Sequence, residues 1–260
     1  LRYFTQDDSH IFVTPEQLEH EIERVVDIVD YFYKKFNLEY HVELSTRPEK
    51  KMGSDEIWDK AEVALENALK RKGVKYKINP GEGAFYGPKI DFHIKDSLGR
   101  TWQCATVQVD FMMPERFDVN YIGEDNKQHR PVIVHRVIYG AIERFIGILT
   151  EHYNGAFPLW LAPTQIRVIS FTDRNEDAAK KVLHKLIEAE LRVDSDFRPA
   201  TVDYKVREAE MQRVPYIIVI GDKEEKSNTL AVRKRGGKPE FGVKSDDFLQ
   251  KIKEEIEEMK

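Results

Sequence analysis

The chain has 260 residues, which is enough for one large domain or two ordinary domains. Charged residues make up 33% of the chain and hydrophobic residues 41%, which predicts a packed core and excludes a disordered chain. The net charge of −5 excludes a uniformly basic protein but permits a local patch that binds nucleic acid. One Cys, no apolar run near the roughly 20 residues of a membrane span and no signal peptide predict a cytoplasmic protein without a disulfide framework.

The first 160 residues predict several antiparallel strands with helices between them, which is an α+β fold. Because the chain starts at Leu1 within a strand-like run, we expect it to be a piece of a longer protein. Thr14 and Pro15 predict a helix start, since Thr caps helices and Pro fits their first position. The predicted elements are a strand over 1–14 with a polar interruption at 6–10, helices over 14–36 and 54–72, a strand over 40–44, an antiparallel hairpin of strands over 89–95 and 101–111, a strand over 131–135 and a helix over 136–152.

A proline-bounded break over residues 156–163 precedes a different rhythm, in which strands alternate with helices. This rhythm predicts a small α/β domain with a mixed, largely parallel sheet. Basic and acidic side chains balance over 161–260, so the net charge falls on the predicted first domain, 1–160. The elements predicted in the second domain are strands over 166–171, 192–197, 216–220 and 230–235 and helices over 175–190, 201–213 and 245–259.

Several side chains invite a chemical interpretation that spacing alone leaves open. Arg144 lies at the edge of the apolar face of the helix predicted from Arg136, with Gly140 one turn earlier to allow close packing on a sheet. Because an unpaired buried charge is costly, Arg144 needs an anion, either a core carboxylate or a ligand phosphate. The apolar face comprises Val137, Ala141, Phe145 and Ile148.

Other candidates are weaker when each is taken alone. His10 and His135 are far apart in the sequence, so each is typical of a hydrogen-bonded structural His rather than a metal ligand. Cys104 fits a small buried hydrophobe, and the glycine-rich loop over 81–88 lacks the Gly-Lys-Ser/Thr ending of a P-loop. A basic cluster fits either a solvated face or a nucleic-acid contact at a strand end. It comprises Arg233, Lys234, Arg235 and Lys238.

Specific strings extend this interpretation, because they resemble the threonyl branch of the class II aminoacyl-tRNA synthetases in the same order along the chain. Residues 4–12 (FTQDDSHIF) resemble the second strand of motif 2, and residues 140–145 (GAIERF) resemble motif 3. Further matches are 45–50 (STRPEK), 83–89 (GAFYGPK), 103–108 (QCATVQ), the domain junction 160–163 (WLAP) and 221–224 (GDKE). The resemblance covers essentially the whole chain and implies the C-terminal part of such an enzyme, with a partial catalytic core over 1–160 and an anticodon-binding domain over 161–260.

The resemblance implies a threonine pocket built around a zinc ion. His10 and His135 match two of its ligands, and the third, a Cys, is expected upstream of this chain. A metal that demands a hydroxyl separates threonine from isosteric valine better than an apolar pocket does. Asp8 matches the acceptor of the substrate hydroxyl, and Tyr86 lies near the amino group. The other implied pocket residues are Gln6, Cys104 and Gln108.

The resemblance also implies an ATP site and an RNA-reading site. Arg144 matches the motif 3 Arg that contacts the ATP phosphates, and Gln103 matches another ATP contact. Lys89 matches a position near the reacting phosphate, and Mg²⁺ is expected to bind together with ATP. In the second domain, the positions implied to read anticodon bases are Arg207, Glu224 and Arg233. Pro199 stands where the family commonly has Asn, so one base contact departs from the pattern.

Together these matches imply ATP-dependent activation of L-threonine and its transfer to tRNA(Thr) by a parent enzyme that is a homodimer. The motif 1 dimer segment, the first strand of motif 2 and the editing domain used against serine are absent from these residues. Two alternatives remain: a synthetase for prolyl, glycyl or histidyl substrates, and a non-catalytic tRNA-binding or regulatory module. The string over residues 5–10 and the paired His10 and His135 favour the threonine enzyme.

Overall fold

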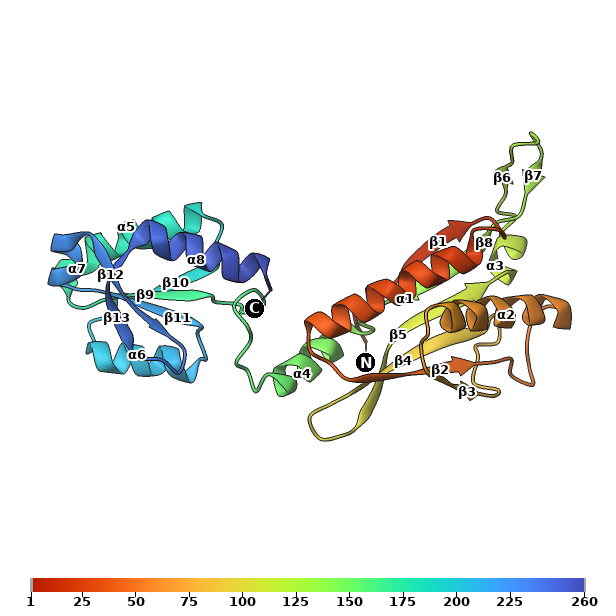
Figure 1. Cartoon of the computed structure of the whole chain (residues 1–260), viewed down its shortest axis with the longest axis horizontal. Helices are drawn as coiled ribbons and strands as arrows, with labels where there is room; N and C mark the ends of the chain where they lie inside the picture. Colours follow the sequence, from red (N-terminus) through yellow and green to blue (C-terminus); the bar gives the residue numbers. More distant parts are fainter. Residues whose placement is uncertain (1, 260) are drawn as a thin grey trace. The chain divides into compact units, whose positions relative to one another are not determined.

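The computed structural model describes residues 2–259 and contains two compact units (Figure 1). The first unit ends at Glu151 and the second begins at His152. Each unit has its own β-sheet and its own buried apolar residues. Leu1, where the sequence predicts that a strand begins, lies outside the described residues.

A six-stranded sheet forms the centre of the first unit, in the order β1-β8-β5-β4-β2-β3. Its neighbouring strands are antiparallel except for β2 and β3, which are parallel, so the predicted α+β fold is confirmed. The hairpin of β4 and β5 was predicted, whereas the short strand β3 was not. The strands are β1 (Ser9–Val13), β2 (Tyr40–Ser45), β3 (Tyr76–Asn79), β4 (Lys89–Lys95), β5 (Thr101–Asp110) and β8 (Val132–Val137).

Two long helices, α1 (Leu18–Lys35) and α2 (Asp55–Arg71), pack against this sheet and against each other. Their apolar residues recur at helical spacing and form one buried stripe on each helix. The buried Tyr33 hydroxyl accepts a hydrogen bond from the Ala105 N–H and donates one to the Ile138 carbonyl, each at 2.9 Å. This side chain therefore ties α1 to β5 and to the segment that follows β8.

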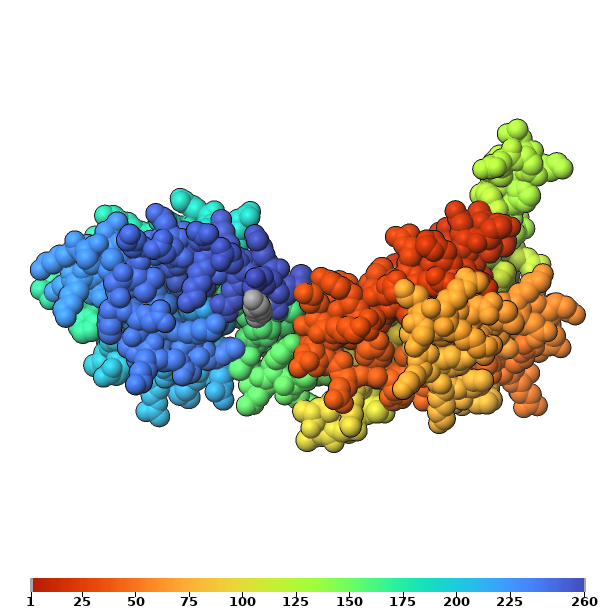
Figure 2. All heavy atoms as spheres, in the orientation of Figure 1, coloured from red at the N-terminus to blue at the C-terminus, as the bar shows by residue number. Residues whose placement is uncertain are grey.

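Four further elements complete the first unit: α3 (Met112–Arg116), β6 (Tyr121–Ile122), β7 (Gln128–His129) and α4 (Ile142–His152). The sequence did not predict α3, β6 or β7, which are shorter than the periodicity of apolar residues can reveal. Strands β6 and β7 form a hairpin that stands clear of the rest of the first unit in Figure 2, where it is light green.

The second unit is built on a five-stranded mixed sheet, in the order β10-β9-β11-β12-β13. Strands β10, β9 and β11 are parallel, whereas β12 and β13 are antiparallel to their neighbours. Helices α5 and α8 supply residues to the core on one face, and α6 to the core on the other. The elements are β9 (Ile166–Ser170), α5 (Glu176–Glu188), β10 (Val193–Asp196), α6 (Val202–Met211), β11 (Tyr216–Ile220), α7 (Asp222–Ser227), β12 (Thr229–Lys234), β13 (Pro239–Lys244), α8 (Ser245–Glu257) and the one-turn 3₁₀ helix Asp173–Asn175.

Three predicted boundaries in the first unit are wrong. Helix α1 begins at Leu18 with Gln17 as its N-cap, rather than at Thr14 and Pro15, and the other two concern the strand pair β1 and β8. Residues 2–5 are not a strand, because β1 pairs with β8 only from Ser9, and His10 belongs to β1 rather than to a polar interruption. The helix predicted from Arg136 begins later, since β8 runs on to Val137 and Gly140 turns the chain with a φ of +76°. Val137 is therefore a sheet residue rather than part of a helix face.

Candidate functional site

One row of directly opposite residues crosses four strands of the first unit's sheet. His10 lies opposite His135, His135 opposite Gln108, and Gln108 opposite Lys89. Opposite residues on neighbouring strands project from the same face of a sheet. The positions next to them are fully buried apolar residues on the other face: Ile90, Val107 and Val134. The structure thus gathers four sequence-predicted site residues on one face, away from the apolar packing.

The two histidines of this row are close enough to bind one ligand. Their ring centroids lie 4.4 Å apart with the ring planes at 72°. His135 Nε2 lies 3.0 Å from a carboxylate oxygen of the fully buried Asp110. A carboxylate on one ring nitrogen commonly orients a His that binds a metal through the other nitrogen. Two imidazoles with this support fit two of the three protein ligands of an open zinc site.

Tyr86 and Asp8 border the histidine pair. The Tyr86 ring meets the His135 ring edge-on, with centroids 5.8 Å apart. Burial raises the pKa of Tyr86, and the negative charges of Asp110 and Asp8 raise it further. The Tyr86 hydroxyl is therefore a proton-bearing donor at neutral pH, close to the exposed carboxylate of Asp8.

The neighbouring segment is anchored by Asp7, a residue whose role the sequence did not reveal. Its two carboxylate oxygens accept hydrogen bonds from the N–H groups of Ile138 and Tyr139, at 2.8 and 3.0 Å. Gln6 forms an isolated bridge with Ala141 just before α4. Residues 6–8 are thus fixed beside the end of β8, which places Gln6 and Asp8 at the border of the same face.

Asp91 joins the polar residues of β4 and β5, and sequence reasoning missed it. It is buried and accepts hydrogen bonds from Ser45 Oγ at 2.8 Å, Gln103 Nε2 at 2.5 Å and Thr106 Oγ1 at 3.1 Å. The ammonium group of Lys89 pairs with it as well. The available signal was a carboxylate inside an otherwise apolar strand. Asp91 holds Lys89 and Gln103, both predicted site residues, on one face.

Arg144 is exposed at the start of α4, so the predicted place beside an apolar core is wrong. Its Nη2 donates a hydrogen bond to the Gln103 carbonyl at 2.6 Å, and its guanidinium carbon lies 5.7 Å from the centroid of the Trp102 ring. Within residues 2–259 no carboxylate pairs with Arg144 in an ion pair. A guanidinium that is held by a carbonyl and an indole keeps most of its donors for an anion.

Cys104 and Gly140 form the contact beneath Arg144. Burial raises the pKa of the Cys104 thiol to about 11, and the Arg144 charge offsets part of this rise. The thiol is therefore protonated and unreactive at neutral pH. A Cβ atom on Gly140 would lie 3.0 Å from the Cys104 carbonyl oxygen, so this position requires glycine for close approach as well as for its positive φ. The predicted role of Gly140 in packing a helix is replaced by this turn.

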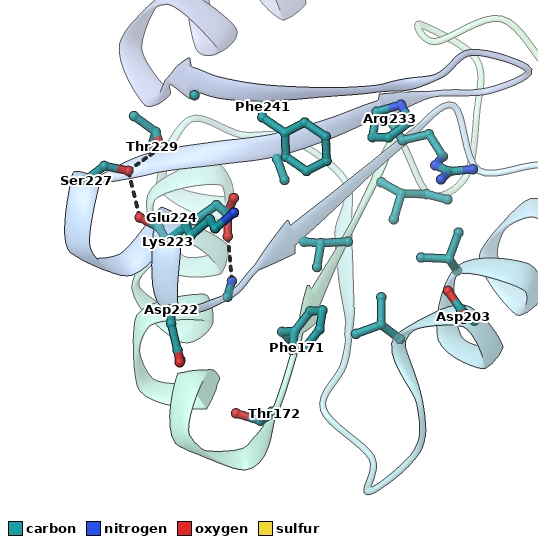
Figure 3. Close-up of a pocket in the computed structure, with 18 of the residues that line it drawn as sticks. Phe171, Thr172, Asp203, Asp222, Lys223, Glu224, Ser227, Thr229, Arg233 and Phe241 are labelled. Atoms are coloured by element: carbon teal, nitrogen blue, oxygen red, sulfur yellow. Dashed lines mark hydrogen bonds between the residues drawn. The ribbon is translucent and has the colours of Figure 1, made fainter.

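In the second unit, a cavity of about 910 Å³ opens on the face of the sheet that α6 partly covers. Glu224 of α7 and Arg233 of β12 line it, as do the half-exposed Phe171 and the exposed Phe241. Figure 3 shows both rings facing the hollow between Glu224 and Arg233. One Glu224 carboxylate oxygen accepts a hydrogen bond from the Gly221 N–H at 3.1 Å. The cavity combines charged and aromatic groups, which suits unstacked nucleic-acid bases.

The third residue predicted for base reading is placed differently. Arg207 is exposed on α6, one position beyond Val206, which lines the cavity, and Arg207 itself is outside the lining. Pro199, the departure from the family pattern, is exposed in the connection before α6. The structure therefore brings Glu224 and Arg233 together and leaves Arg207 at the periphery.

The predicted basic cluster is not one patch, because neighbouring residues of a strand project from opposite faces. Arg233 faces the cavity and pairs with Glu210 at 2.9 Å. Lys234 pairs with Glu255 of α8 at 3.2 Å. Arg235 donates hydrogen bonds to the carbonyls of Ala156 and Phe157 and so fixes the start of the second unit. Three of the four basic residues thus have separate structural partners.

Two parts of the chain match known domain families. Residues 1–153 match the tRNA synthetase class II core domain (G, H, P, S and T), and residues 165–255 match an anticodon binding domain. The chain belongs to the class II tRNA synthetase family. The family that the sequence motifs predicted is thereby confirmed, and this class II core contains the whole row from His10 to Lys89.

Individual relatives of this class II chain are threonine enzymes. The threonine–tRNA ligase of Desulforamulus reducens is 55% identical over 257 residues, and that of Syntrophomonas wolfei is 57% identical over 259 residues. Each match covers 99% of this chain but only 40% and 41% of those proteins, so the chain spans about two fifths of their length. A crystal structure of the RNA binding domain of threonyl-tRNA synthetase from Cryptosporidium parvum is similar, with a TM-score of 0.88 and 37% identity over 96% of this chain and 63% of that one.

A second solved structure, the putative threonyl-tRNA synthetase ThrRS-1 of Aeropyrum pernix, has a TM-score of 0.77 and 28% identity, and the match covers 98% of this chain and 64% of that chain. Both matches extend over nearly the whole of this chain. Among residues 2–259, no helix of this synthetase chain is long and apolar enough to cross a membrane.

Proposed function

We propose that this chain supplies the catalytic and anticodon-binding parts of an ATP-dependent ligase that joins L-threonine to tRNA(Thr). The observation that carries the proposal is the row His10, His135, Gln108 and Lys89, because it brings the residues predicted for amino-acid and phosphate binding onto one face. The relatives named threonine–tRNA ligase support the choice of amino acid. Because the chain spans two fifths of their length, we assign the reaction to a longer parent protein.

Threonine would bind at the histidine end of the row. His10 and His135 would hold a Zn²⁺ ion, which supplies a Lewis acid that selects a substrate with a hydroxyl next to its amino group. Asp8 would accept the hydrogen bond of the threonine hydroxyl, and the Tyr86 hydroxyl would lie near the amino group. Gln6, Gln108 and the buried Cys104 would shape the pocket wall. The positions of Gln108 and Tyr86 beside His135 support their roles, whereas Cys104 lies beneath Arg144.

The zinc ligands divide between this chain and its parent. A zinc ion of this kind needs three protein ligands, and His10 and His135 offer two. We propose that the third, a Cys, lies in the parent protein outside these 260 residues. The pair should then bind zinc weakly in this chain and tightly in the parent, which elemental analysis of both proteins can test. One tight zinc that depends on Cys104 in this chain would contradict this division.

ATP would bind at the other end of the row. Arg144 would meet the phosphates with the guanidinium donors that the Gln103 carbonyl leaves open, and Gln103 would contact the nucleotide. The Lys89 ammonium group would leave Asp91 and bind phosphate oxygens. It would then stabilise the charge that develops on the α-phosphate. Mg²⁺ would arrive with ATP. Catalysis would then rest on positioning and charge stabilisation rather than on a covalent enzyme intermediate.

Arg144→Ala in the parent protein tests this site. Loss of one preorganised charge donor should lower threonine-dependent pyrophosphate exchange by about 10²–10³-fold. The fold should survive, because Arg144 is exposed and its main partners are a carbonyl and an indole ring. Exchange near the unmodified rate would return Arg144 to a structural role.

A panel of amino acids in the same assay separates the threonine enzyme from prolyl, glycyl and histidyl synthetases, and no exchange with any of them would favour a non-catalytic module.

The second unit would read the tRNA anticodon. Glu224 offers two acceptors and Arg233 a bidentate donor to base edges in the cavity, while Arg207 would contact the RNA from its border. Because basic and acidic residues balance over 161–260, attraction must come from local charges and should weaken with salt. The parent's homodimeric state and its cytoplasmic location stay predictions.

Binding of anticodon stem-loops to the chain tests this reading. Arg233→Ala should cost about 1–3 kcal/mol and relax the preference between matched and altered anticodons. Lys238→Ala is the control, since Lys238 is exposed outside the cavity lining and should affect all stem-loops alike. Equal losses from both substitutions would mean that this unit only docks phosphates.

A further inference from the structure

A second group of metal-ligating side chains lies on the first unit's sheet, outside the proposed threonine and ATP residues. His41 and Glu43 are two positions apart on β2, and His93 lies directly opposite His41 on β4. The three side chains therefore project from one face of the sheet. Among residues 2–259 they are the one group of three His, Cys, Asp or Glu side chains whose ligand atoms converge, all within 4.8 Å of one another.

We propose that His41, Glu43 and His93 form a binding site for a divalent transition-metal ion of the zinc type. Two imidazoles and one carboxylate are the ligand set that zinc and its neighbours prefer, whereas Mg²⁺ and Ca²⁺ prefer oxygen alone. Each residue supplies one ligand, and water completes the coordination sphere. The site does not depend on the proposed ligase activity.

The distances from the Glu43 carboxylate to the two imidazoles suit such an ion. One Glu43 carboxylate oxygen lies 3.6 Å from His41 Nε2, and the other lies 3.7 Å from His93 Nε2. Both distances exceed a good hydrogen bond. In a tetrahedral zinc site with bonds of about 2.0–2.1 Å, ligand atoms lie about 3.3 Å apart. A shift of a few tenths of an ångström therefore brings the carboxylate to ligand distance from each nitrogen, whereas the two nitrogens, which lie within 4.8 Å of each other, approach by rotation of a ring.

The surroundings prepare the ligands for a metal. The imidazole rings of His41 and His93 are stacked nearly parallel, with centroids 4.9 Å apart and a 9° angle, so one ring must rotate before the in-plane lone pairs of both can meet one ion. Asn79 Nδ2 donates a hydrogen bond of 2.9 Å to one Glu43 oxygen, which orients the carboxylate. Burial lowers the pKa of His93, although Glu43 opposes this effect, and the neutral imidazole is the form that binds metals.

Access to the site comes from the His41 side. The His41 side chain is 49% exposed, whereas those of His93 and Glu43 are 20% and 17% exposed. One ligand at the surface and two below it leave a path for the ion and room for coordinated water. Gln103 lies opposite His93 on β5, so the site borders the proposed ATP contacts without sharing a ligand with them.

Cobalt titration of the 260-residue chain tests the proposal, because bound Co²⁺ absorbs visible light and Zn²⁺ displaces it. The background is the double variant His10→Gln, His135→Gln, which removes the other histidine pair. We expect saturable binding of one Co²⁺ per chain in this background. Glu43→Gln and His93→Gln should each weaken it by more than about 100-fold, since losing a direct ligand exceeds the 10–100-fold effect of losing its support. His20→Gln, at an exposed position on α1, is the control and should change nothing.

Two outcomes would overturn the site. One is the absence of saturable Co²⁺ binding below about 1 mM in background protein that circular dichroism shows to be folded. The other is unchanged binding in Glu43→Gln or His93→Gln. Should a buried substitution disturb the fold, His41→Gln answers the question, because this half-exposed side chain is the one least embedded in the sheet. These readouts do not involve aminoacylation, so they stand apart from the test of the proposed ligase.

Discussion

The two cross-strand histidine pairs of the first unit have the same origin and different surroundings. His10 and His135 lie directly opposite each other on β1 and β8, as His41 and His93 do on β2 and β4. The first pair meets edge-on at 72° and has the carboxylate of Asp110 on the far nitrogen of one ring. The second pair is stacked at 9° and has a carboxylate that faces both rings.

The difference shows that antiparallel register brings two imidazoles together, but the third group decides what they can do. In the first pair the carboxylate orients a ring from behind, so a further ligand must come from elsewhere, and the open side is left for a substrate. In the second pair Glu43 stands in the position of a ligand, so the set is complete within this chain. The first arrangement fits the proposed substrate-binding metal site, and the second fits the proposed self-contained one.

The largest expected effect concerns the first pair, His10 and His135, and its proposed role in selecting the substrate. His135→Gln in the parent protein should lower the preference for threonine over valine by about 100-fold, because a hydroxyl-demanding site discriminates by about 10⁴ and an apolar pocket by only about 10². Pyrophosphate exchange with each amino acid measures the ratio. His20→Gln is the matched control at an exposed helix position. An unchanged ratio would remove the histidine pair from the amino-acid pocket.

A smaller effect should follow from the support behind the first pair. Asp110 accepts hydrogen bonds from the N–H groups of Met112 and Met113, at 2.7 and 2.9 Å. Asp110→Asn keeps an oxygen for these hydrogen bonds but removes the charge beside His135. Zinc affinity of the parent should fall by about 10–100-fold. Competition with a chelator measures it. If Co²⁺ binding at His41, Glu43 and His93 fell equally, the two pairs would not be independent sites.

The counterpart at the second pair is Asn79, whose amide is a weaker support than a carboxylate. Asn79→Ala removes the hydrogen bond to Glu43 and leaves the backbone pairing of β3 in place. Co²⁺ affinity at the second site should fall by about tenfold, at the lower end of the range for such partners. The same titration as for the ligand variants measures this loss. An effect as large as that of Glu43→Gln would mean that Asn79 maintains the fold of β3 rather than the orientation of the carboxylate.

The contrast between the pairs also shows how far the sequence could be interpreted. Alternating apolar residues predicted β2, β4 and β5, and specific strings predicted the family and the pair His10 and His135. The second pair was not predicted, because α2 and β3 lie between β2 and β4 in the chain, and no local pattern fixes the register of strands so far apart. The same limit hid the contacts that Asp91 makes to β2 and β5.

One error could have been avoided from the sequence. Arg233 and Lys234 lie on opposite faces of β12, and the period of two along a strand already separates them. A basic cluster on a strand should therefore be divided by face before it is interpreted as one patch. The placement of Gly140 was harder, because a glycine before a helix and one inside it look alike until the end of the preceding strand is known.

The smallest expected effect concerns the hairpin that carries the second pair's β4. Asp96 closes the turn between β4 and β5: its oxygens accept hydrogen bonds from the N–H groups of Leu98 and Arg100, at 2.9 and 2.8 Å, and from the side chains of Arg100 and Trp102, at 2.6 and 2.9 Å. Burial raises the pKa of Asp96, but these donors outweigh burial and lower it from the ordinary 3.8 to about 2.

A carboxylate whose pKa is depressed by folding contributes stability above its unfolded pKa, and this stability is lost as the pH falls through the folded pKa. The unfolding free energy of the chain should therefore exceed that of Asp96→Asn at pH 6, and the difference should shrink between about pH 4 and pH 2. Urea unfolding at several pH values measures both proteins. Because imidazoles are protonated in this range, the effect reports the turn and not metal binding. A difference that stays constant down to pH 2 would show that the Asp96 charge does not hold the hairpin, and that the register of His93 is set by β2 instead.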